Sequence, residues 1–255
     1  MRHIKLVVEY DGTQLSGWQR QANGPSVQQH LEEALGKLLQ HDATVIGASR
    51  TDAGVSARGQ VCSFRTVRPI ALHGVRRGLN SLLPDAIAIR DASEVPDDFH
   101  PRYSATGKLY RYTILARPDR SPLTPRAWHH SAPLELAAVR EAARALHGEH
   151  DFSAFRAAGC TARTTLRRVD DIAIAAPDER VIVEVRGNAF LRQMVRIIVG
   201  TLVDVGTGRL AAAQVAEILA SKDRTRAGQT APAHGLELVE VLYTGTRVSS
   251  GSGSR

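Results

Sequence analysis

Strand-like segments alternate with amphipathic helical segments along the whole chain, and this order most limits the folds available to it. Strands are indicated by β-branched and aromatic residues, or by alternating apolar and polar residues. Strands are expected at His3–Tyr10, Gly59–Phe64, Lys108–Leu115, Arg167–Ala175, Arg180–Arg186 and Leu236–Tyr243. Helices are expected at Ser26–Gln40, 71–82, Leu134–His147, Ala189–Val203 and Leu210–Ser221. Such a mixture, with the alternation typical of antiparallel strands, predicts an α+β fold.

The two halves of the chain repeat a similar order of elements. This similarity indicates two α/β subdomains of related build that share a sheet or a cleft. The boundary is expected near His100-Pro101, which gives an N-terminal subdomain at 1–104 and a C-terminal one at 105–245. Residues 246–255, with the Gly/Ser-rich VSSGSGSR, are expected to form a flexible tail.

Composition limits the setting and the partners of the chain. A hydrophobic fraction of 43% is enough for a packed core. No segment is apolar over the length of a membrane span, and the two distant cysteines fit a reducing compartment, so a cytoplasmic location is expected. The chain has 33 Lys+Arg against 26 Asp+Glu, for a net charge of +7. This excess favours nucleic acid or an acidic surface as partner, with a merely basic surface as the alternative.

Several absent motifs narrow the chemistry further. The sequence has no P-loop and no G-x-G-x-x-G, which are the usual phosphate-binding loops for ATP and NAD. It also lacks the H-x-E and P-C-x-x-C pair of zinc nucleobase deaminases. Neither a nucleotide cofactor nor a metal site is therefore expected.

A single carboxylate stands out in GASRTDAGVSARGQV, residues 47–61. Arg50 and Thr51 precede Asp52, and Ala53-Gly54 follows it. The local sequence alone favours a turn or cap role for this aspartate. The functional alternative is a carboxylate kept ionised and oriented by a guanidinium in a cleft, where it could act as a nucleophile or a base.

Two further segments carry groups that suit a nucleic-acid substrate. In GNAFLRQMVRIIVG, residues 187–200, helical spacing puts Arg192 and Arg196 four apart on one face, away from an apolar face. An anion between them would remove their mutual repulsion, whereas a solvated basic face is the alternative. In GKLYRYTIL, residues 107–115, strand alternation puts Tyr110 and Tyr112 on one face. These tyrosines could pack in the core or stack on an unpaired base.

Six segments, taken in order, resemble the tRNA pseudouridine synthases of the TruA type, which isomerise uridines 38, 39 and 40 in the anticodon arm. The segments are VEYDGTQLSGWQRQ, GASRTDAGVSARGQV, GKLYRY, GEHDFSAF, FLRQMVRIIVG and TAPAHGLELVEVLY. The resemblance runs from about residue 4 to residue 243. It implies a pseudouridine synthase fold, with mostly antiparallel sheets flanked by helices and a central RNA-binding cleft.

The resemblance also implies roles for individual residues. Asp52 matches the catalytic aspartate, Arg196 the basic residue that pairs with it, and Tyr110 the tyrosine that stacks on the target base. Arg50 matches the arginine that helps to extrude the nucleotide, and Thr51 lies beside it in the same core. Arg192 is then a candidate for a phosphate contact.

Two positions in the loop around Asp52 depart from the family pattern. Ser49 stands where the family usually has Gly, and Ser56 where His is common, so the local detail of the loop is in question. Further arginines are candidates for contacts with the RNA backbone: Arg65, Arg68, Arg76, Arg77, Arg156, Arg163, Arg167 and Arg168.

Pseudouridylation breaks the N1–C1′ bond, turns the uracil and rejoins it through C5. The reaction oxidises nothing and imports no group, so the resemblance implies no cofactor. It also implies a homodimer that binds the anticodon arm of tRNA. Two rival hypotheses remain at this level: a non-catalytic tRNA-binding protein and a nucleoside hydrolase or glycosylase. Whether Asp52 would attack the sugar, attack the base or remove a sugar proton is likewise open.

Overall fold

A computed structural model describes residues 1–22 and 24–244, so the expected tail at 246–255 lies outside the described residues. The described strands are β1 (Arg2–Tyr10), β2 (Ile46–Gly47), β3 (Ser56–Thr66), β4 (Ile87–Glu94), β5 (Ala105–Ala116), β6 (Trp128–His130), β7 (Gly148–Asp151), β8 (Leu166–Ala175), β9 (Arg180–Gly187) and β10 (Leu236–Tyr243). The described helices are α1 (Val27–Leu39), α2 (Leu72–Leu82), α3 (Leu136–Arg144), α4 (Met194–Gly206) and α5 (Gln214–Ser221).

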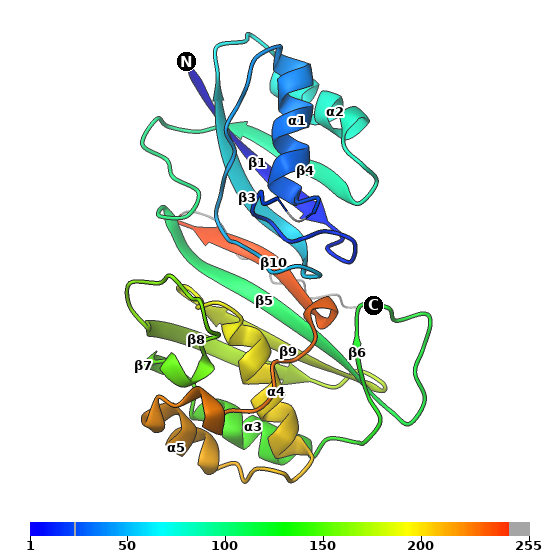
Figure 1. The fold of residues 1–255 in the computed structure, drawn as a ribbon, viewed down its shortest axis with the longest axis vertical. Helices are drawn as coiled ribbons and strands as arrows, with labels where there is room; N and C mark the ends of the chain where they lie inside the picture. The colour runs from blue at the N-terminus through cyan, green and yellow to red at the C-terminus, as the bar shows by residue number, and fades with distance from the viewer. Residues whose placement is uncertain (23, 245–255) are drawn as a thin grey trace.

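One sheet runs through the described part of the molecule (Figure 1). Its ten strands include a continuous path in the order β4-β1-β3-β10-β5-β9-β8-β7, with β2 paired to β3 and β6 paired to β5. All neighbours pair antiparallel except β10 with β3 and β5 with β6, which are parallel. The predicted α+β fold with a mostly antiparallel sheet is therefore confirmed.

Strand β10, near the end of the chain, joins the two halves of the sheet. Leu238 pairs with Ala57 of β3 on one side and with Tyr110 of β5 on the other. The halves thus share a sheet, and the strand between them comes from the C-terminal part of the sequence. The division of the chain at residues 104 and 105 stays a prediction.

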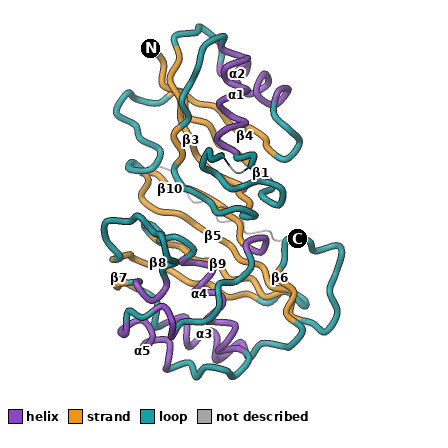
Figure 2. The backbone as a smooth tube through the Cα atoms, viewed as in Figure 1, coloured by secondary structure: helices purple, strands orange, loops and turns teal. Residues whose placement is uncertain are grey.

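The helices lie beside the strands of their own half, α1 and α2 beside the N-terminal strands and α3 to α5 beside the C-terminal ones (Figure 2). Strand β1 alternates buried and partly exposed residues, as expected when one face of a sheet is covered. Helix α4 is buried along most of its length and belongs to the same hydrophobic core as the strands. None of the helices in the described residues is long and apolar enough to cross a membrane.

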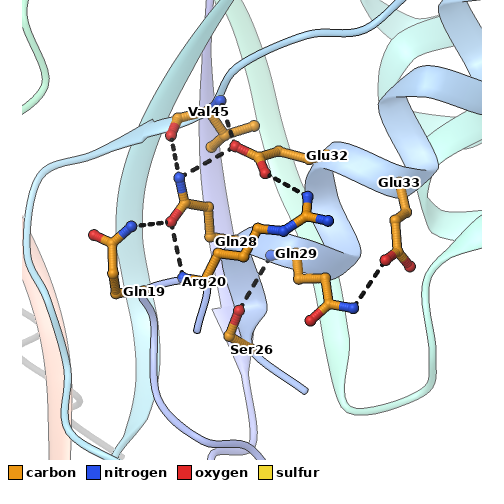
Figure 3. Close-up of polar contacts among 8 residues, drawn as sticks. All are labelled: Gln19, Arg20, Ser26, Gln28, Gln29, Glu32, Glu33 and Val45. Atoms are coloured by element: carbon orange, nitrogen blue, oxygen red, sulfur yellow. Dashed lines mark hydrogen bonds and ion pairs between the residues drawn. The ribbon is translucent and has the colours of Figure 1, made fainter. Parts of the chain in front are cut away.

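Helix α1 starts where the sequence predicted. Ser26 is its N-cap, and its Oγ accepts a hydrogen bond from the Gln29 backbone N–H at 3.3 Å. The side chain of Gln29 donates to Glu33 instead of returning to the cap, so only half of a capping box forms. Figure 3 shows both contacts at the start of the helix.

The predicted helix Ala189–Val203 was wrong at its start, because α4 begins at Met194. Gln193 has φ +59°, in the left-handed region, and the Met194 N–H donates to the Leu191 carbonyl in a tight turn. Arg192 therefore lies in this turn and Arg196 on the helix. The prediction that the two arginines share a helix face was wrong, and the argument from their mutual repulsion no longer applies.

Candidate active site

Asp52 lies in a tight turn that leads into β3. The Val55 N–H donates to the Asp52 carbonyl at 3.1 Å, and Gly54 has φ +81°. Glycine accepts this left-handed conformation without the steric penalty of a Cβ. The turn is thus made by backbone groups, which leaves the Asp52 carboxylate available for a contact elsewhere.

That contact is with Arg196 on α4, 144 residues further along the chain. Arg196 Nη1 lies 3.1 Å from Asp52 Oδ2, and the two side chains are 13% and 26% exposed. The guanidinium is itself held, because its Nε donates to the Ala231 carbonyl at 2.7 Å. The Ala231 N–H donates in turn to the Arg196 carbonyl at 3.1 Å. The segment TAPAHGLELVEVLY therefore fixes the arginine that faces Asp52.

The segment VEYDGTQLSGWQRQ supports the turn from the other side. The Tyr10 hydroxyl and Thr51 Oγ1 form a hydrogen bond at 2.7 Å, and the Trp18 N–H donates to the Thr51 carbonyl. Thr51 is buried, so its side chain holds the loop in place. Gly17 has φ +90°, and a Cβ there would lie 2.6 Å from the Thr51 carbonyl oxygen. Only glycine lets the two backbones approach this closely.

A second polar network fixes the neighbouring wall of the site, and Gln28 on α1 is its centre (Figure 3). The Gln28 Oε1 accepts from the Gln19 side chain and from the Arg20 N–H. Its Nε2 donates to the Val45 carbonyl at 3.0 Å and to Glu32 at 3.1 Å. This network ties the loop before β2 to the segment that carries Trp18.

Tyr110 on β5 completes the floor of the site. Its ring packs edge-on against Phe190, with centroids 5.2 Å apart, and its hydroxyl is 2.8 Å from Ser49 Oγ. Burial raises the pKa of Tyr110 to about 12; the hydrogen bond with Ser49 opposes this rise and the negative charge of Asp52 adds to it. Ser49 is one of the two departures from the family pattern. The other, Ser56, accepts a hydrogen bond from the Gly12 N–H at 3.1 Å.

Gln28, Thr51, Asp52 and Tyr110 are among the residues that line a cleft of about 720 Å³, a usual size for a ligand-binding site. Both halves of the chain contribute to its walls. Among the described residues that line it, Asp52 is the only carboxylate. Five cationic side chains line it as well: Arg50, Arg102, Lys108, Arg167 and Arg192. A lone carboxylate in a cleft of this charge can attack or deprotonate an anionic substrate that the surrounding cations attract.

The other arginines that the sequence indicated as RNA-binding candidates differ in their position relative to the cleft. Arg50 is exposed at the cleft, and Arg192, also exposed, donates to the Ala158 carbonyl at 3.1 Å. Of the eight arginines proposed to grip RNA, Arg167 lines the cleft, whereas Arg65 and Arg168 are ion-paired to Asp97 and Asp170.

GEHDFSAF does not reach the cleft. Phe152 and Phe155 are fully buried in the core, so this segment supports the fold.

Sequence reasoning missed Arg102 and Lys108 as cleft residues. A signal for Lys108 was present, because the alternation that pairs Tyr110 with Tyr112 places Lys108 on the same face of β5. Arg102 lies in a turn between β4 and β5, and no periodic pattern marks it.

The cleft, with five cations around one carboxylate among the described lining residues, suits an anionic ligand, and comparisons with known proteins identify the family of the chain. A family model described as tRNA pseudouridine synthase matches residues 6–104 and 142–244. Three proteins named tRNA pseudouridine synthase A align with 95% of this chain. They come from Syntrophotalea carbinolica (53% identical, 97% of that protein covered), Geobacter sulfurreducens (52%, 100%) and Myxococcus xanthus (49%, 92%).

The chain therefore belongs to the tRNA pseudouridine synthase family and is an isomerase, which confirms the predicted family and enzyme class. A solved structure described as an archaeal box H/ACA sRNP Nop10-Cbf5 complex aligns with 78% of this chain and 44% of that chain. It is 13% identical to this chain, with a TM-score of 0.35.

Proposed function

We propose that the protein converts uridine to pseudouridine at positions 38, 39 and 40 in the anticodon stem-loop of tRNA, with Asp52 as the essential carboxylate. One observation carries this proposal: Asp52, the only carboxylate among the described cleft residues, faces the Arg196 guanidinium at 3.1 Å. The relatives named tRNA pseudouridine synthase A support the reaction and the class of RNA.

The cleft suits a nucleotide that has been extruded from its stem. Uridine in a stacked stem is inaccessible, and extrusion costs a few kcal/mol. Arg50 is exposed beside the cleft, where its side chain can fill the gap that the nucleotide leaves. The extruded base then lies against Tyr110, in reach of the Asp52 carboxylate. Arg192, exposed in the turn before α4, contacts the RNA backbone.

The reaction needs no partner beyond the RNA. The N1–C1′ bond breaks, the uracil turns, and the C5–C1′ bond forms. The proton on C5 leaves and N1 gains one, so the product is an isomer of the substrate. The Ala231 carbonyl accepts a hydrogen bond from Arg196 and so holds its guanidinium in place. The fixed guanidinium keeps the Asp52 carboxylate oriented toward the nucleotide.

Site-resolved mapping of pseudouridine in tRNA treated with wild-type protein and with Asp52→Asn tests the proposal. We expect wild type to modify positions 38 to 40 and to release tritium from C5-labelled uridine there. Asp52→Asn should lower the rate by about 10²- to 10⁴-fold, the usual contribution of a catalytic acid–base group, while its Kd for tRNA changes little. Asp91→Asn is the matched control, because it makes the same charge change at an exposed position of β4.

Three outcomes would contradict the proposal. Normal turnover by Asp52→Asn would remove the carboxylate from the chemistry, and wild type that binds tRNA without modifying it would indicate a non-catalytic binding protein. Release of free uracil would indicate a glycosylase, and the mass of the RNA distinguishes the two reactions because isomerisation leaves it unchanged.

We also propose that the protein acts as a homodimer in the cytoplasm, as the family resemblance implies. Light scattering on the purified protein tests the dimer, and a single-protomer mass at working concentration would contradict it. Cell fractionation tests the location.

A further inference from the structure

Lys108 is a buried cation in the wall of the cleft. It lies on β5, is only 7% exposed, and lines the cleft. Its ammonium makes no hydrogen bond or ion pair with any of the residues that the structure describes. Lysine is almost never this buried unless it is paired, because desolvating an uncompensated charge is costly. The position therefore calls for a negative partner from outside the chain.

Two arginines from other segments, Arg102 and Arg167, lie close enough to Lys108 to affect its protonation. Burial and, to a lesser extent, the positive charges of Arg102 and Arg167 together lower the pKa of Lys108 to about 8. Arg167 on β8 has its Nε buried with no hydrogen-bond acceptor among the described residues. Arg102 comes from the turn before β5 and is exposed. Three cations thus converge, while the only carboxylate among the described cleft residues is already paired to Arg196.

Lys108 also has a defined position relative to Tyr110. The two residues are two apart on one strand, so their side chains share a face and lie about 7 Å apart along it. Across the sheet Lys108 pairs with Gly187, and Gly187 pairs with Val169 of β8. Arg167 is two residues from Val169 on that strand, so it shares the same face. Gly187 has no side chain to separate the lysine from β8.

We propose that Lys108, together with Arg102 and Arg167, forms a subsite for one backbone phosphate next to the nucleotide that lies against Tyr110. The inference rests on the proposed function, which places that nucleotide in the cleft. A phosphodiester fits because it carries a fixed negative charge and acceptor oxygens for both the Lys108 ammonium and the Arg167 guanidinium. The alternative is that the lysine stem merely packs in the wall with its head in water.

Binding of an anticodon stem-loop RNA at a series of salt concentrations tests the subsite. Lys108→Met removes the charge and keeps an unbranched apolar side chain. We expect it to weaken binding about tenfold, as for the loss of a charge-assisted hydrogen bond. It should also make the slope of log K against log salt shallower by about 0.7 to 0.9, the value of one phosphate contact. Lys108→Arg should retain the wild-type slope.

Lys37→Met is the matched control, since it removes the same charge from an exposed position of α1 outside the cleft. It should leave the slope unchanged. A second measurement uses stem-loop RNAs that each carry one neutral methylphosphonate linkage. At one linkage near the target uridine, wild type should lose about tenfold in affinity, and Lys108→Met should lose nothing more, because both changes remove the same contact.

The outcomes separate the subsite from the proposed function. The subsite would be overturned if Lys108→Met had the same salt slope as wild type. It would also be overturned if the losses in affinity from Lys108→Met and from the methylphosphonate added at every position. Either result would count even if wild type forms pseudouridine. Failure of wild type to form pseudouridine would overturn the proposed function, and the salt slopes would still decide whether Lys108 holds a phosphate. Weaker binding by Lys108→Met with an unchanged slope would assign the lysine to packing.

Discussion

Replacement of Arg196 by methionine is the sharpest test of the arrangement around Asp52. The side chain makes two contacts, one from Nη1 to Asp52 at 3.1 Å and one from Nε to the Ala231 carbonyl at 2.7 Å. Arg196→Met removes both and leaves the carboxylate without its cation. Arg196→Lys keeps a positive charge but can replace only one of the two contacts, because an ammonium lacks the planar fork of a guanidinium.

The structure sets the expected magnitudes. A hydrogen bond to a charged group contributes about 1.5 to 3 kcal/mol, which corresponds to about 10- to 150-fold in rate if the carboxylate acts in the transition state. The pair is mostly buried, so its loss should affect stability by an amount between the ~1 kcal/mol of a surface pair and the ~3 to 5 kcal/mol of a buried one. With the Ala231 contact also lost, we expect the free energy of unfolding of Arg196→Met to fall by about 2 to 3 kcal/mol.

Single-turnover formation of pseudouridine, with enzyme in excess and saturating, measures the rate apart from binding. Urea unfolding measures stability in parallel. Arg192→Met is the contrast variant, since Arg192 is exposed and the one hydrogen bond of its side chain among the described residues is to the Ala158 carbonyl. It should raise the Kd for RNA with little change in the single-turnover rate. A rate for Arg196→Met within twofold of wild type, or equal rate losses for the two variants, would refute the reasoning.

Three further predictions concern the loop and the cleft. Ser49→Ala removes the hydrogen bond to Tyr110, so the pKa of Tyr110 should rise above about 12 in an ultraviolet titration, and the single-turnover rate should fall about fivefold, as for about 1 kcal/mol; an unchanged pKa would show that the bond does not form in solution. Gly54→Ala puts a Cβ at φ +81° and should lower the free energy of unfolding by about 1 to 2 kcal/mol in urea, whereas wild-type stability would contradict the turn. The RNA affinity of wild type should fall as pH rises through about 8, because free protein then loses the Lys108 proton that a bound phosphate retains, and a fall equally steep in Lys108→Arg would exclude this cause. This titration uses a Cys160→Ser background, since the pKa of that thiol is lowered by backbone hydrogen bonds and nearby guanidiniums that together outweigh its burial.

Local patterns predicted the elements of the fold better than their ends. The apolar stripe and Ser26 placed α1 within a residue of its observed start, because a cap and a helical period are local properties. The start of α4 was missed, since Gln193 adopts a left-handed φ that no side-chain preference indicates. Four strands were also missed: β2, β6 and β7 have two to four residues, too few to show a period, and β4 alternates buried and less buried residues only over its first three positions.

The site was predicted mainly through the family resemblance. Nothing in the local sequence of Asp52 or Arg196 indicates that they meet, because their contact joins segments 144 residues apart. Lys108 differs from these two residues, because a local pattern does indicate which way its side chain points. Strand alternation applied to Lys108 would place it on the face of Tyr110, but periodicity cannot reveal that its charge has no partner there. That property depends on which side chains the other strands bring near it.

The placement of β10 has a consequence for how the enzyme is made. This strand lies between β3 and β5, although residues 236–243 are synthesised long after both. An N-terminal segment generally starts to fold while the rest of the chain is still being translated. Here the edges of β3 and β5 that pair with β10 stay unpaired until β10 is synthesised. The loop that carries Ala231 is synthesised just before β10. A nascent chain that stops short of β10 would thus lack the strand that joins β3 to β5, and its two halves could not form one continuous sheet.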